Sequence, residues 1–365
     1  MSRLVFSVLV PGLFTTVQDG GRWGYQGKGM PVAGAMDQQS FRIGNILAGN
    51  GETYAALEVT LLGPTLSVAE GEGVVAVAGA ELGFRVNGMP VPNWTGVAVR
   101  AGDVLSFSPP LSGCRAYLCV SGGLDVPVVM GSRSTYTRAR VGGMEGRTLK
   151  KGDLLPCGEP DLLWRFCEGL VCPGHLRPER DPGAFLRVVP GPQEDLFTEK
   201  GREAFYSSGY TVSASADRMG YRLEGPSIEH GGPADIISDA IPPGAVQVPG
   251  HGRPIIMLAD RQTTGGYPKI GVVCSPDVSA LAQRIPGQEV RFRAISVREA
   301  VEAVLEEEWK RGEMRRLRAA WRSTRGVPVR EPAVHRGPAS LKGEAILRVD
   351  GKEHRVSWEE IQPLP

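Results

Sequence analysis

The sequence lacks the features that define several large classes of protein. Its 365 residues contain no apolar run approaching the ~18 residues that a membrane-spanning helix needs. Its formal net charge of +1 provides no basic surface for nucleic acid. The short apolar start, MSRLVFSVLVPGLF, fits a first strand better than a cleaved signal peptide. We therefore expect a cytoplasmic protein that contacts neither membrane nor nucleic acid.

Cysteine is also scarce for a disulfide-stabilised protein, with six residues in a chain of this length. Cys157, Cys167, Cys172 and His175 lie close in sequence, but they lack the paired C-x-x-C spacing that usually anchors zinc. The sequence therefore predicts reduced, partly buried thiols and no metal site.

Several common catalytic motifs are missing. The segment around Lys28 is not a phosphate loop, because Gly29 occupies a position that requires Ser or Thr. There is no G-x-S-x-G nucleophile elbow, and the five histidines pair with no evident nucleophile. His230 and His251 could each act as a general base, and a histidine that only serves a turn is the alternative interpretation.

Glycine and proline, by contrast, are abundant, with 49 and 29 residues spread along the chain. Glycine supplies positive φ and proline fixes φ, so this composition indicates many short strands joined by tight turns. We predict a mainly β protein with a few helices, built from barrels or sandwiches. One early helix is expected to begin after Asp37, a capping residue, and to end near Gly49.

Changes in composition divide the chain into parts. We expect a first β-rich domain over residues 1–170 and a second over 184–295, joined by a linker over 168–183 that is rich in proline, glycine and charge. A helix is expected over 296–325, and a hairpin tail over 343–361.

The predicted C-terminal helix has a clear start signal, because Ser296 and Glu299 can form a capping box. Apolar residues then recur at helical spacing, which predicts one packed face and one solvated face. These residues are Val297, Ala300, Val301, Val304, Leu305 and Trp309. Residues 327–342 read as a flexible linker, and Asp350-Gly351 is the expected turn of the hairpin tail.

The stretch DRQTTGGYPKIG, which begins at Asp260, follows a buried apolar strand and concentrates many kinds of polar group. Taken singly, its residues suggest a strand-end ion pair between Asp260 and Arg261, a β-turn and a solvated Lys269. Taken together, they predict a pocket in which Arg261 and Lys269 neutralise carboxylate or phosphate oxygens. The two adjacent glycines would let backbone N–H groups approach an anion.

We assign catalytic roles in this pocket to Asp260, Arg261 and Lys269. The hydroxyl and amide groups beside them would orient a planar, amide-like substrate. The substrate-binding candidates within the stretch are Gln262, Thr263, Thr264, Gly265, Gly266 and Tyr267.

Three other segments, residues 15–26, 34–45 and 214–226, also contain more polar groups than a turn needs. For the first of them, a capped Gly-Gly turn is the alternative interpretation. Further substrate-binding candidates from these segments, and from the strand region before the stretch, are Gln18, Asp19, Arg22, Asp37, Asn45, Arg218 and Gln247.

At these segments the sequence resembles the carboxyltransferase subdomain family. This family includes the C component of bacterial 5-oxoprolinase, proteins similar to allophanate hydrolase subunit 2, and the carboxyltransferase region of urea carboxylase. The resemblance extends from residue 11 to about residue 295. The matching phrases are GLFTTVQDGGRWGYQ, GAMDQQSFRIGNILAGN, LEVTLLGP, VSGGLDVPVVMGSRSTY, VVPGPQEDLF, SADRMGYRLEGP and QVPGHGRPIIMLADRQTTGGYPKIG.

The resemblance implies two cyclophilin-like β-barrel domains and an enzyme that works in a complex. It implies partners similar to the A and B components of 5-oxoprolinase, which together with the C component hydrolyse the lactam of 5-oxoproline to glutamate at the expense of ATP with Mg²⁺. In that reaction Arg261, Lys269 and the Gly265-Gly266 backbone would stabilise negative charge. Asp260 would hold Arg261 or act as a base.

The resemblance leaves two other functions open. One is a biotin-dependent carboxyltransferase acting on urea or a related amide. The other is a regulatory antagonist that binds a kinase inhibitor similar to the B component. The tail AILRVDGKEHRVSWEEI is similar to the hairpin that precedes a biotin carrier domain in some carboxylases, but no Met-Lys-Met site follows. Any biotin would therefore arrive on another chain.

Overall fold

The computed structural model describes residues 3–179, 183–325, 342–349 and 352–359. It divides into two compact units, residues 1–325 and residues 326–365. The smaller unit contains one antiparallel hairpin, formed by β22 (Lys342–Val349) and β23 (Lys352–Glu359). Its predicted turn at Asp350-Gly351 lies outside the described residues, and so does the predicted linker over 327–342 except for Lys342, which begins β22.

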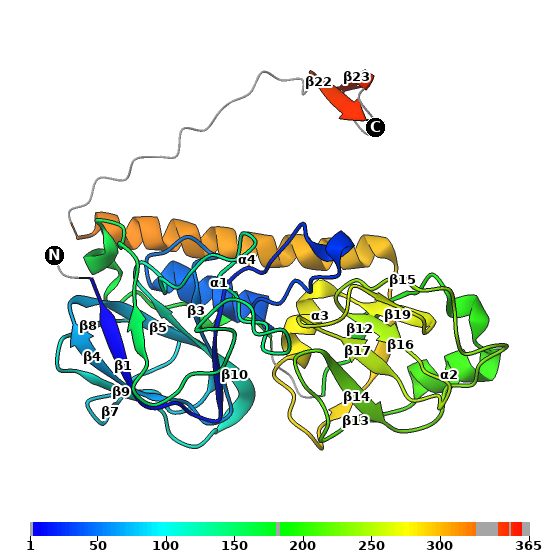
Figure 1. Ribbon diagram of the computed structural model, residues 1–365, viewed down its shortest axis with the longest axis horizontal. Helices are drawn as coiled ribbons and strands as arrows, with labels where there is room; N and C mark the ends of the chain where they lie inside the picture. Colours follow the sequence, from blue (N-terminus) through cyan, green and yellow to red (C-terminus); the bar gives the residue numbers. More distant parts are fainter. Residues whose placement is uncertain (1–2, 180–182, 326–341, 350–351, 360–365) are drawn as a thin grey trace. The chain divides into compact units, whose positions relative to one another are not determined.

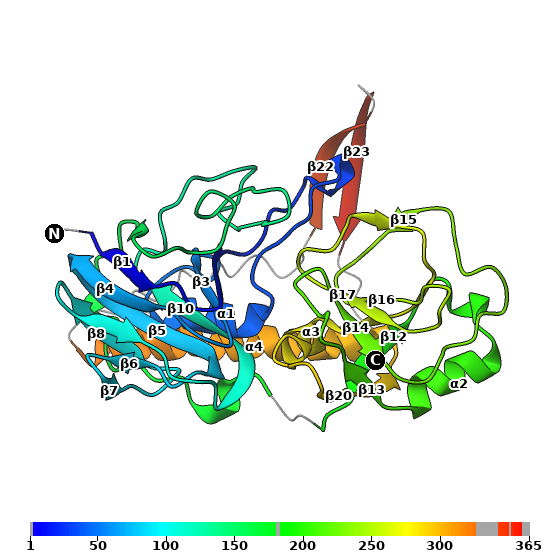
Figure 2. The ribbon, with the colours of Figure 1, turned by 60° about the horizontal axis from the view of Figure 1, so that its bottom comes forward.

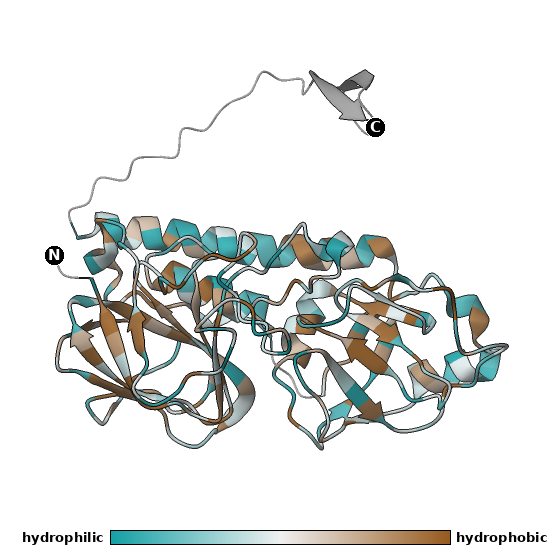
Figure 3. Ribbon diagram, viewed as in Figure 1, coloured by the Kyte–Doolittle hydropathy of each residue, from teal (hydrophilic) through white to brown (hydrophobic). Residues whose placement is uncertain are grey.

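The larger unit is mainly β, as predicted, and consists of two barrel-like halves that lie beside each other (Figure 1). Hydrophobic residues concentrate on the strands of both halves (Figure 3). Four α-helices are present among the described residues, and none of the described helices is long and apolar enough to cross a membrane.

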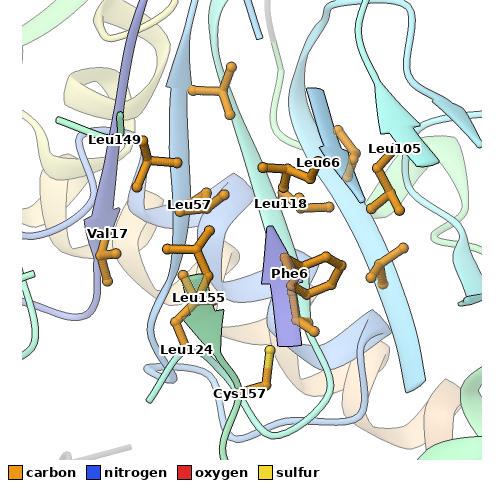
Figure 4. Close-up of a cluster of buried hydrophobic side chains, with 14 of the residues drawn as sticks. Phe6, Val17, Leu57, Leu66, Leu105, Leu118, Leu124, Leu149, Leu155 and Cys157 are labelled. Atoms are coloured by element: carbon orange, nitrogen blue, oxygen red, sulfur yellow. The ribbon is translucent and has the colours of Figure 1, made fainter. Parts of the chain in front are cut away.

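The first half contains two antiparallel sheets, with strand orders β11-β1-β4-β9-β6-β7 and β2-β3-β10-β5-β8. Side chains such as Phe6, Leu57, Leu66 and Leu118 fill the space between the sheets and are almost fully buried (Figure 4). The strands are β1 (Val5–Val10), β2 (Phe14–Gln18), β3 (Ala56–Thr60), β4 (Thr65–Glu70), β5 (Glu72–Glu81), β6 (Arg85–Val86), β7 (Met89–Pro90), β8 (Gly96–Arg100), β9 (Val104–Ser106), β10 (Ser112–Val120) and β11 (Leu154–Pro156).

Helix α1 (Gln38–Leu47) covers the outer face of the second of these sheets, with Phe41 and Ile46 fully buried. Asp37 caps it as predicted, because its side chain accepts a hydrogen bond from Ser40 N at 3.0 Å. Gly44 allows the close approach, since a Cβ there would lie 2.8 Å from Cys119 Sγ.

The second half has one eight-stranded sheet with the order β20-β13-β14-β17-β16-β19-β12-β21. Its strand pairs are antiparallel except for the parallel pair of β12 and β21. The strands are β12 (Leu186–Pro190), β13 (Tyr210–Val212), β14 (Gly220–Glu224), β16 (Ala245–Gln247), β17 (Ile255–Met257), β19 (Lys269–Val273), β20 (Glu289–Val290) and β21 (Phe292–Ala294); the helices of this half are α2 (Glu199–Ser207) and α3 (Ser275–Leu281).

A separate two-stranded ribbon belongs to this half, formed by β15 (Asp239–Ala240) and β18 (Thr264–Gly265). Figure 2 shows β15 at the end of the second half opposite β13 and β20. Its strand β18 lies between β17 and β19, within the polar stretch of the sequence.

The segment expected to be a linker packs against the first half over its described part. Leu170, Cys172 and Leu176 are buried beside α1 and Trp94 in a common cluster. Short 3-10 helices at Trp164–Cys167 and Gly174–Leu176 shape this segment. This part of the predicted linker is therefore packed, because burying three apolar side chains removes them from water.

Helix α4 (Val297–Ser323) begins with the predicted capping box and contacts α1 of the first half and α3 of the second. Its packed face differs from the predicted one. Ala303 and Met314 are buried, together with Arg311 and Arg322, whereas the apolar positions at the expected spacing are largely exposed. Val297, Val301, Val304, Leu305 and Trp309 have exposed fractions of 42–66%.

Candidate active site

The polar stretch that begins at Asp260 lies where two pairs of strands meet. Gln247 on β16 is the register partner of Lys269 on β19. Gly265 on β18 is the register partner of Asp239 on β15. The fold therefore gathers Gln247, Lys269, Asp239 and Gly265 at one end of the second half, and we call these residues together with Gln262 and Gln193 the lysine cluster.

Lys269 is buried, with 1% of its surface exposed, and is not the solvated strand residue that its sequence context also suggested. Its ammonium donates to Asp239 Oδ2 at 2.8 Å. Its main-chain N–H donates to Gln193 Oε1 at 3.2 Å. The ion pair with Asp239 compensates the buried ammonium, because removing a charge from water is costly.

Asp239 is the acid that holds this charge, and its side chain is half exposed. The hydrogen bond from Lys269 and one from its neighbour Ala240 N keep the pKa of Asp239 below its usual value. We did not predict Asp239 or Gln193 from the sequence. The available signal was weak, because Asp239 is on a two-residue strand and Gln193 precedes a short 3-10 helix, and the pairing of β15 with β18 cannot be read from local pattern.

Gln247, the last residue of β16, and Gln262, which follows β17, both approach Gly265. A Cβ at this position would lie 3.0 Å from Gln247 Nε2 and 3.4 Å from Gln262 Nε2. Gln247 donates to Tyr267 O at 3.3 Å, whereas Oε1 of Gln262 is buried and accepts no hydrogen bond from the described residues. The glycine is thus needed for space and not for a positive φ.

The remaining residues of the stretch are more peripheral. Thr264 is exposed, and 41% of Tyr267 is exposed. Thr263 and Gly266 are half-buried, and their carbonyls accept hydrogen bonds from Ile241 N at 3.0 Å and Ile236 N at 2.8 Å. These bonds attach the stretch to the β15 side of the ribbon.

The guanidinium of Arg261 is buried without an acidic partner among the described residues. It donates to the carbonyls of Ile241 at 2.8 Å and Leu258 at 3.0 Å. Burial lowers its pKa to about 10. The expectation that Asp260 holds Arg261 is wrong, because Arg261 turns toward these main-chain oxygens.

Asp260 instead forms a two-point ion pair with Arg218, in which Nε and Nη2 each lie 3.0 Å from a carboxylate oxygen. Arg218 also donates to Gly34 O at 2.7 Å and pairs with Glu58 of the first half. Glu58 accepts further hydrogen bonds from Tyr117 Oη and Met36 N, both at 2.8 Å. We call Asp260, Arg218 and Glu58 the junction network.

The junction network is almost entirely removed from solvent, since its three members have exposed fractions of 1–6%. The main chains also meet here, because Ala33 N donates to Ala259 O at 3.0 Å. Asp260 therefore joins the two halves, and its oxygens are already occupied by a fixed cation.

The candidates near residue 20 lock a loop of the first half. Asp19 accepts hydrogen bonds from Gly21 N at 2.8 Å, Ser132 Oγ at 2.7 Å and Arg133 N at 2.6 Å. Gln18 is fully buried and donates to Thr135 O at 3.1 Å. This arrangement favours the alternative interpretation of a capped turn, extended to a second loop at residues 129–135.

Arg22 belongs to the same loop but also faces the junction. It donates to Val129 O at 2.9 Å and Ser134 O at 2.8 Å, while its Nη1 is buried without a partner among the described residues. Burial lowers its pKa, and the charges of Asp19 and Asp260 oppose that change.

Asp37 and Asn45 lie at the start and in the middle of α1 and have local structural partners. Asp37 accepts a hydrogen bond from Gln283 Nε2 at 2.7 Å, which connects the start of α1 to the segment that follows α3. Asn45 donates to Tyr54 O at 2.9 Å and accepts from Asn50 Nδ2 at 2.8 Å. These bonds give both residues a role in the packing of α1.

The two histidines considered as bases also have local roles. His230 stacks on Phe197 and contacts Pro249 O at 3.2 Å, and His251 Nδ1 accepts from Arg253 N at 3.1 Å. These contacts favour the interpretation of both histidines as residues that serve a turn.

Two open pockets lie elsewhere in the larger unit. One of 770 Å³ is bordered by Asp19, Trp23 and Tyr54 of the first half. Another of 320 Å³ is bordered by Asp37, Asp277 and Glu307, between α1, α3 and α4. The lysine cluster lines neither of them.

Residues 28–294 match a known protein family, "Carboxyltransferase domain, subdomain A and B". The chain is 38% identical over 301 residues to the C component of 5-oxoprolinase from Escherichia coli (strain K12), covering 82% of this chain and 94% of that protein. It is 35% identical over 305 residues to urea amidolyase of Saccharomyces cerevisiae, covering 79% of this chain but only 16% of that protein.

Solved structures show the same relationship. The urea amidolyase of K. lactis superimposes with a TM-score of 0.80 at 32% identity, covering 86% of this chain and 20% of that one. The urea carboxylase of Kluyveromyces lactis gives a TM-score of 0.76 at 30% identity, covering 86% and 29%. The similarity therefore extends over most of this chain and over one region of much longer proteins.

Proposed function

This chain belongs to the carboxyltransferase subdomain A and B family, and on that basis we propose that it is the C component of a multi-subunit, ATP-dependent 5-oxoprolinase. The observation that carries the proposal is the match to the 5-oxoprolinase C component over 94% of that protein's length. The name of that relative implies further subunits, and we propose partners similar to the A and B components for this chain.

In this proposal the lysine cluster binds the substrate. Lys269 would neutralise the carboxylate of 5-oxoproline, and the amide groups of Gln247 and Gln262 would orient the lactam. A lactam carbonyl is a poor electrophile, so transfer of a phosphoryl group to its oxygen would create a leaving group before water attacks. Arg261 is a buried cation with no acidic partner among the described residues, and it is adjacent in sequence to Gln262. We propose that its charge stabilises the negative charge that develops on the substrate.

ATP and Mg²⁺ are proposed for the complex and not for a site on this chain. In the described residues no group of three or more His, Cys, Asp and Glu side chains is placed to hold a metal ion. We derive no step through the nucleotide from this chain's residues.

A second candidate function is carboxyl transfer to urea or a related amide, with biotin carried on another chain. The TM-score of 0.80 to a urea amidolyase favours it. The share of each relative that the chain covers favours the first proposal, because a 94% match is to a whole protein and a 20% match is to one region of a multidomain enzyme.

The test is to assemble the chain with its partner proteins and to measure ATP-dependent release of glutamate from 5-oxoproline. We expect Lys269→Met to lower kcat/KM at least 100-fold, because the variant removes the buried cation. Lys200→Met, at an exposed lysine on α2, is the matched control and should retain the wild-type rate. A wild-type complex that releases no glutamate, yet carboxylates urea when a biotin carrier is supplied, would replace the first proposal with the second.

A further inference from the structure

The lysine cluster contains an ion pair whose two members have very different surroundings. Lys269 has 1% of its surface exposed, whereas half of the side chain of Asp239 is exposed. Among the described residues Asp239 is the only acid within ion-pair distance of the Lys269 ammonium. The buried cation therefore depends on an acid that water can also solvate.

The side chain of Asp239 is held by few bonds. It lies on β15, which pairs with β18 and is flanked by main-chain bonds from Ile236 and Ile241 to the polar stretch. Besides the bond from Lys269, Asp239 Oδ2 accepts only a long hydrogen bond of 3.5 Å from Gln193 Nε2 among the described residues. Turning this half-exposed carboxylate away from Lys269 would give up those two bonds and transfer it to solvent, where a charge is well accommodated, without breaking the main-chain ladder.

Gln262, another member of the lysine cluster, has a side-chain oxygen without a hydrogen bond from the described residues. Its Oε1 is buried and has no donor among the described residues, and a buried acceptor without a donor costs free energy. Gln262 approaches Gly265, which is the register partner of Asp239. A ligand that replaced Asp239 would thus enter next to the glycine that Gln262 approaches, and an N–H group on that ligand would supply the missing donor.

We propose that Asp239 is a displaceable counter-ion for Lys269, and that the substrate's carboxylate takes its place while an adjacent N–H of the substrate donates to Gln262. This inference rests on the proposed function, because 5-oxoproline carries its carboxylate on the carbon next to the lactam N–H. Asp239 then selects for anionic lactams, since only a ligand with its own negative charge can compensate the lysine once the aspartate has left.

The electrostatics agree with an exchange of one anion for another. The hydrogen bond from Lys269 keeps the pKa of Asp239 below its usual value, so the carboxylate is charged at neutral pH. The incoming carboxylate replaces an existing negative charge, so the exchange leaves the charge of the cluster unchanged.

The first experiment measures access to Lys269 without any substrate. The full-length wild-type protein and Asp239→Ala are treated with an amine-reactive reagent, and labelling is followed by peptide mass spectrometry. We expect Asp239→Ala to raise the labelling rate of Lys269 at least fivefold and to leave Lys310 unchanged. Glu306→Gln is the matched control, because Glu306 pairs with Lys310 at 2.9 Å and should affect only that lysine. An unchanged rate at Lys269 would overturn the proposal.

The second experiment measures equilibrium binding to the assembled complex by calorimetry. The ligands are 5-oxoproline and 2-pyrrolidinone, which is the same lactam without the carboxylate. We expect Asp239→Asn to bind 5-oxoproline about tenfold more tightly than wild type and 2-pyrrolidinone equally well. We expect Lys269→Met to lose the preference for 5-oxoproline.

The outcomes separate the two proposals. If Asp239→Asn binds 5-oxoproline no better than wild type, the counter-ion role is overturned while the proposed function stands. If neither lactam binds any of the proteins, the proposed function and the identity of the incoming anion are overturned, and the labelling result alone decides whether Asp239 covers Lys269.

Discussion

The junction network and the lysine cluster are built from the same kinds of residue and have opposite character. In the junction network, Arg218 is bound at several points by Asp260, Glu58 and a main-chain carbonyl, and every member is buried. In the lysine cluster, a buried cation relies on one half-exposed acid, and a buried amide oxygen lacks a donor among the described residues. A fully satisfied network fixes structure, whereas an incomplete one leaves groups for a ligand.

The largest expected effect comes from breaking the junction network. Arg218→Met would leave the carboxylates of Asp260 and Glu58 buried without their shared cation. Asp260 would lose its bidentate partner, and Glu58 would keep only the longer ion pair with Arg115 at 3.9 Å. Loss of one partner of a buried pair costs about 3–5 kcal/mol. We expect the free energy of unfolding from urea titration to fall by at least that amount.

Arg222→Met is the matched control, because Arg222 is on β14, close to Arg218 in sequence, and is exposed. Its free energy of unfolding should stay within about 0.5 kcal/mol of wild type. Equal stability of the two variants would show that the junction network does not hold the halves together.

The next effect concerns the glycine between the two glutamines. In Gly265→Ala the added Cβ would lie 2.7 Å from Ile241 Cδ1 and 3.0 Å from Gln247 Nε2. Crowding of this kind typically costs about 1–3 kcal/mol, and here it would also displace the amide groups. We expect a raised KM for 5-oxoproline together with a lower melting temperature. Gly250→Ala, whose Cβ would meet only Ala234 Cβ at 3.5 Å, should change neither quantity.

A smaller effect on stability is expected from Lys269→Met, which tests the lysine cluster against the junction network directly. Removing this lysine leaves Asp239 half exposed and free to interact with water, so no buried charge is abandoned. We expect the free energy of unfolding to change by less than about 1 kcal/mol, in contrast to Arg218→Met. A loss as large as that of Arg218→Met would make the lysine cluster a structural element like the junction network.

The smallest effect is a pH dependence on α4. Burial, with the charges of Asp37 and Asp277 adding to it, raises the pKa of Glu307 to about 8. The folded protein therefore binds a proton at this group that the unfolded chain releases above its ordinary pKa, so this contribution to stability falls as pH rises toward 8.

Glu307→Gln should remove that part of the pH dependence and raise the melting temperature at pH 8 by roughly 2–4 °C. Glu306→Gln is the control, because the hydrogen bond and charge of Lys310 outweigh burial and lower the pKa of Glu306. Parallel pH profiles for wild type and Glu307→Gln would contradict the assignment.

The sequence predicted the fold better than the site. Turn residues and short apolar runs indicated a mainly β protein, and the caps at Asp37 and Ser296 were recognised because capping depends on residues three positions apart. The packed face of α4 was mispredicted. Its apolar spacing does not show that Ala303 and Met314 face the protein while Leu305 and Trp309 face solvent.

Local pattern could identify the polar stretch but not its partners. Asp260 and Arg261 are adjacent in sequence, yet one binds Arg218, 42 positions away, and the other binds Ile241 O, 20 positions away. Asp239 and Gln193 were missed for the same reason. Their contacts with Lys269 arise only when β15 pairs with β18 and when β12 and the loop after it lie beside β19.

Two hydrogen bonds between the halves limit how the molecule can move. One runs from Ala33 N to Ala259 O, and the other from Arg218 to Gly34 O. They fix the start of the polar stretch at Asp260 to the first half, and its end at Lys269 belongs to β19, so that only its middle, near Gly265, belongs to the short ribbon. Any opening is thereby confined to the middle of the stretch and to β15, and the two halves form a fixed frame around it. Amide hydrogens of β15 and β18 should accordingly exchange with solvent long before those of the strands that flank them.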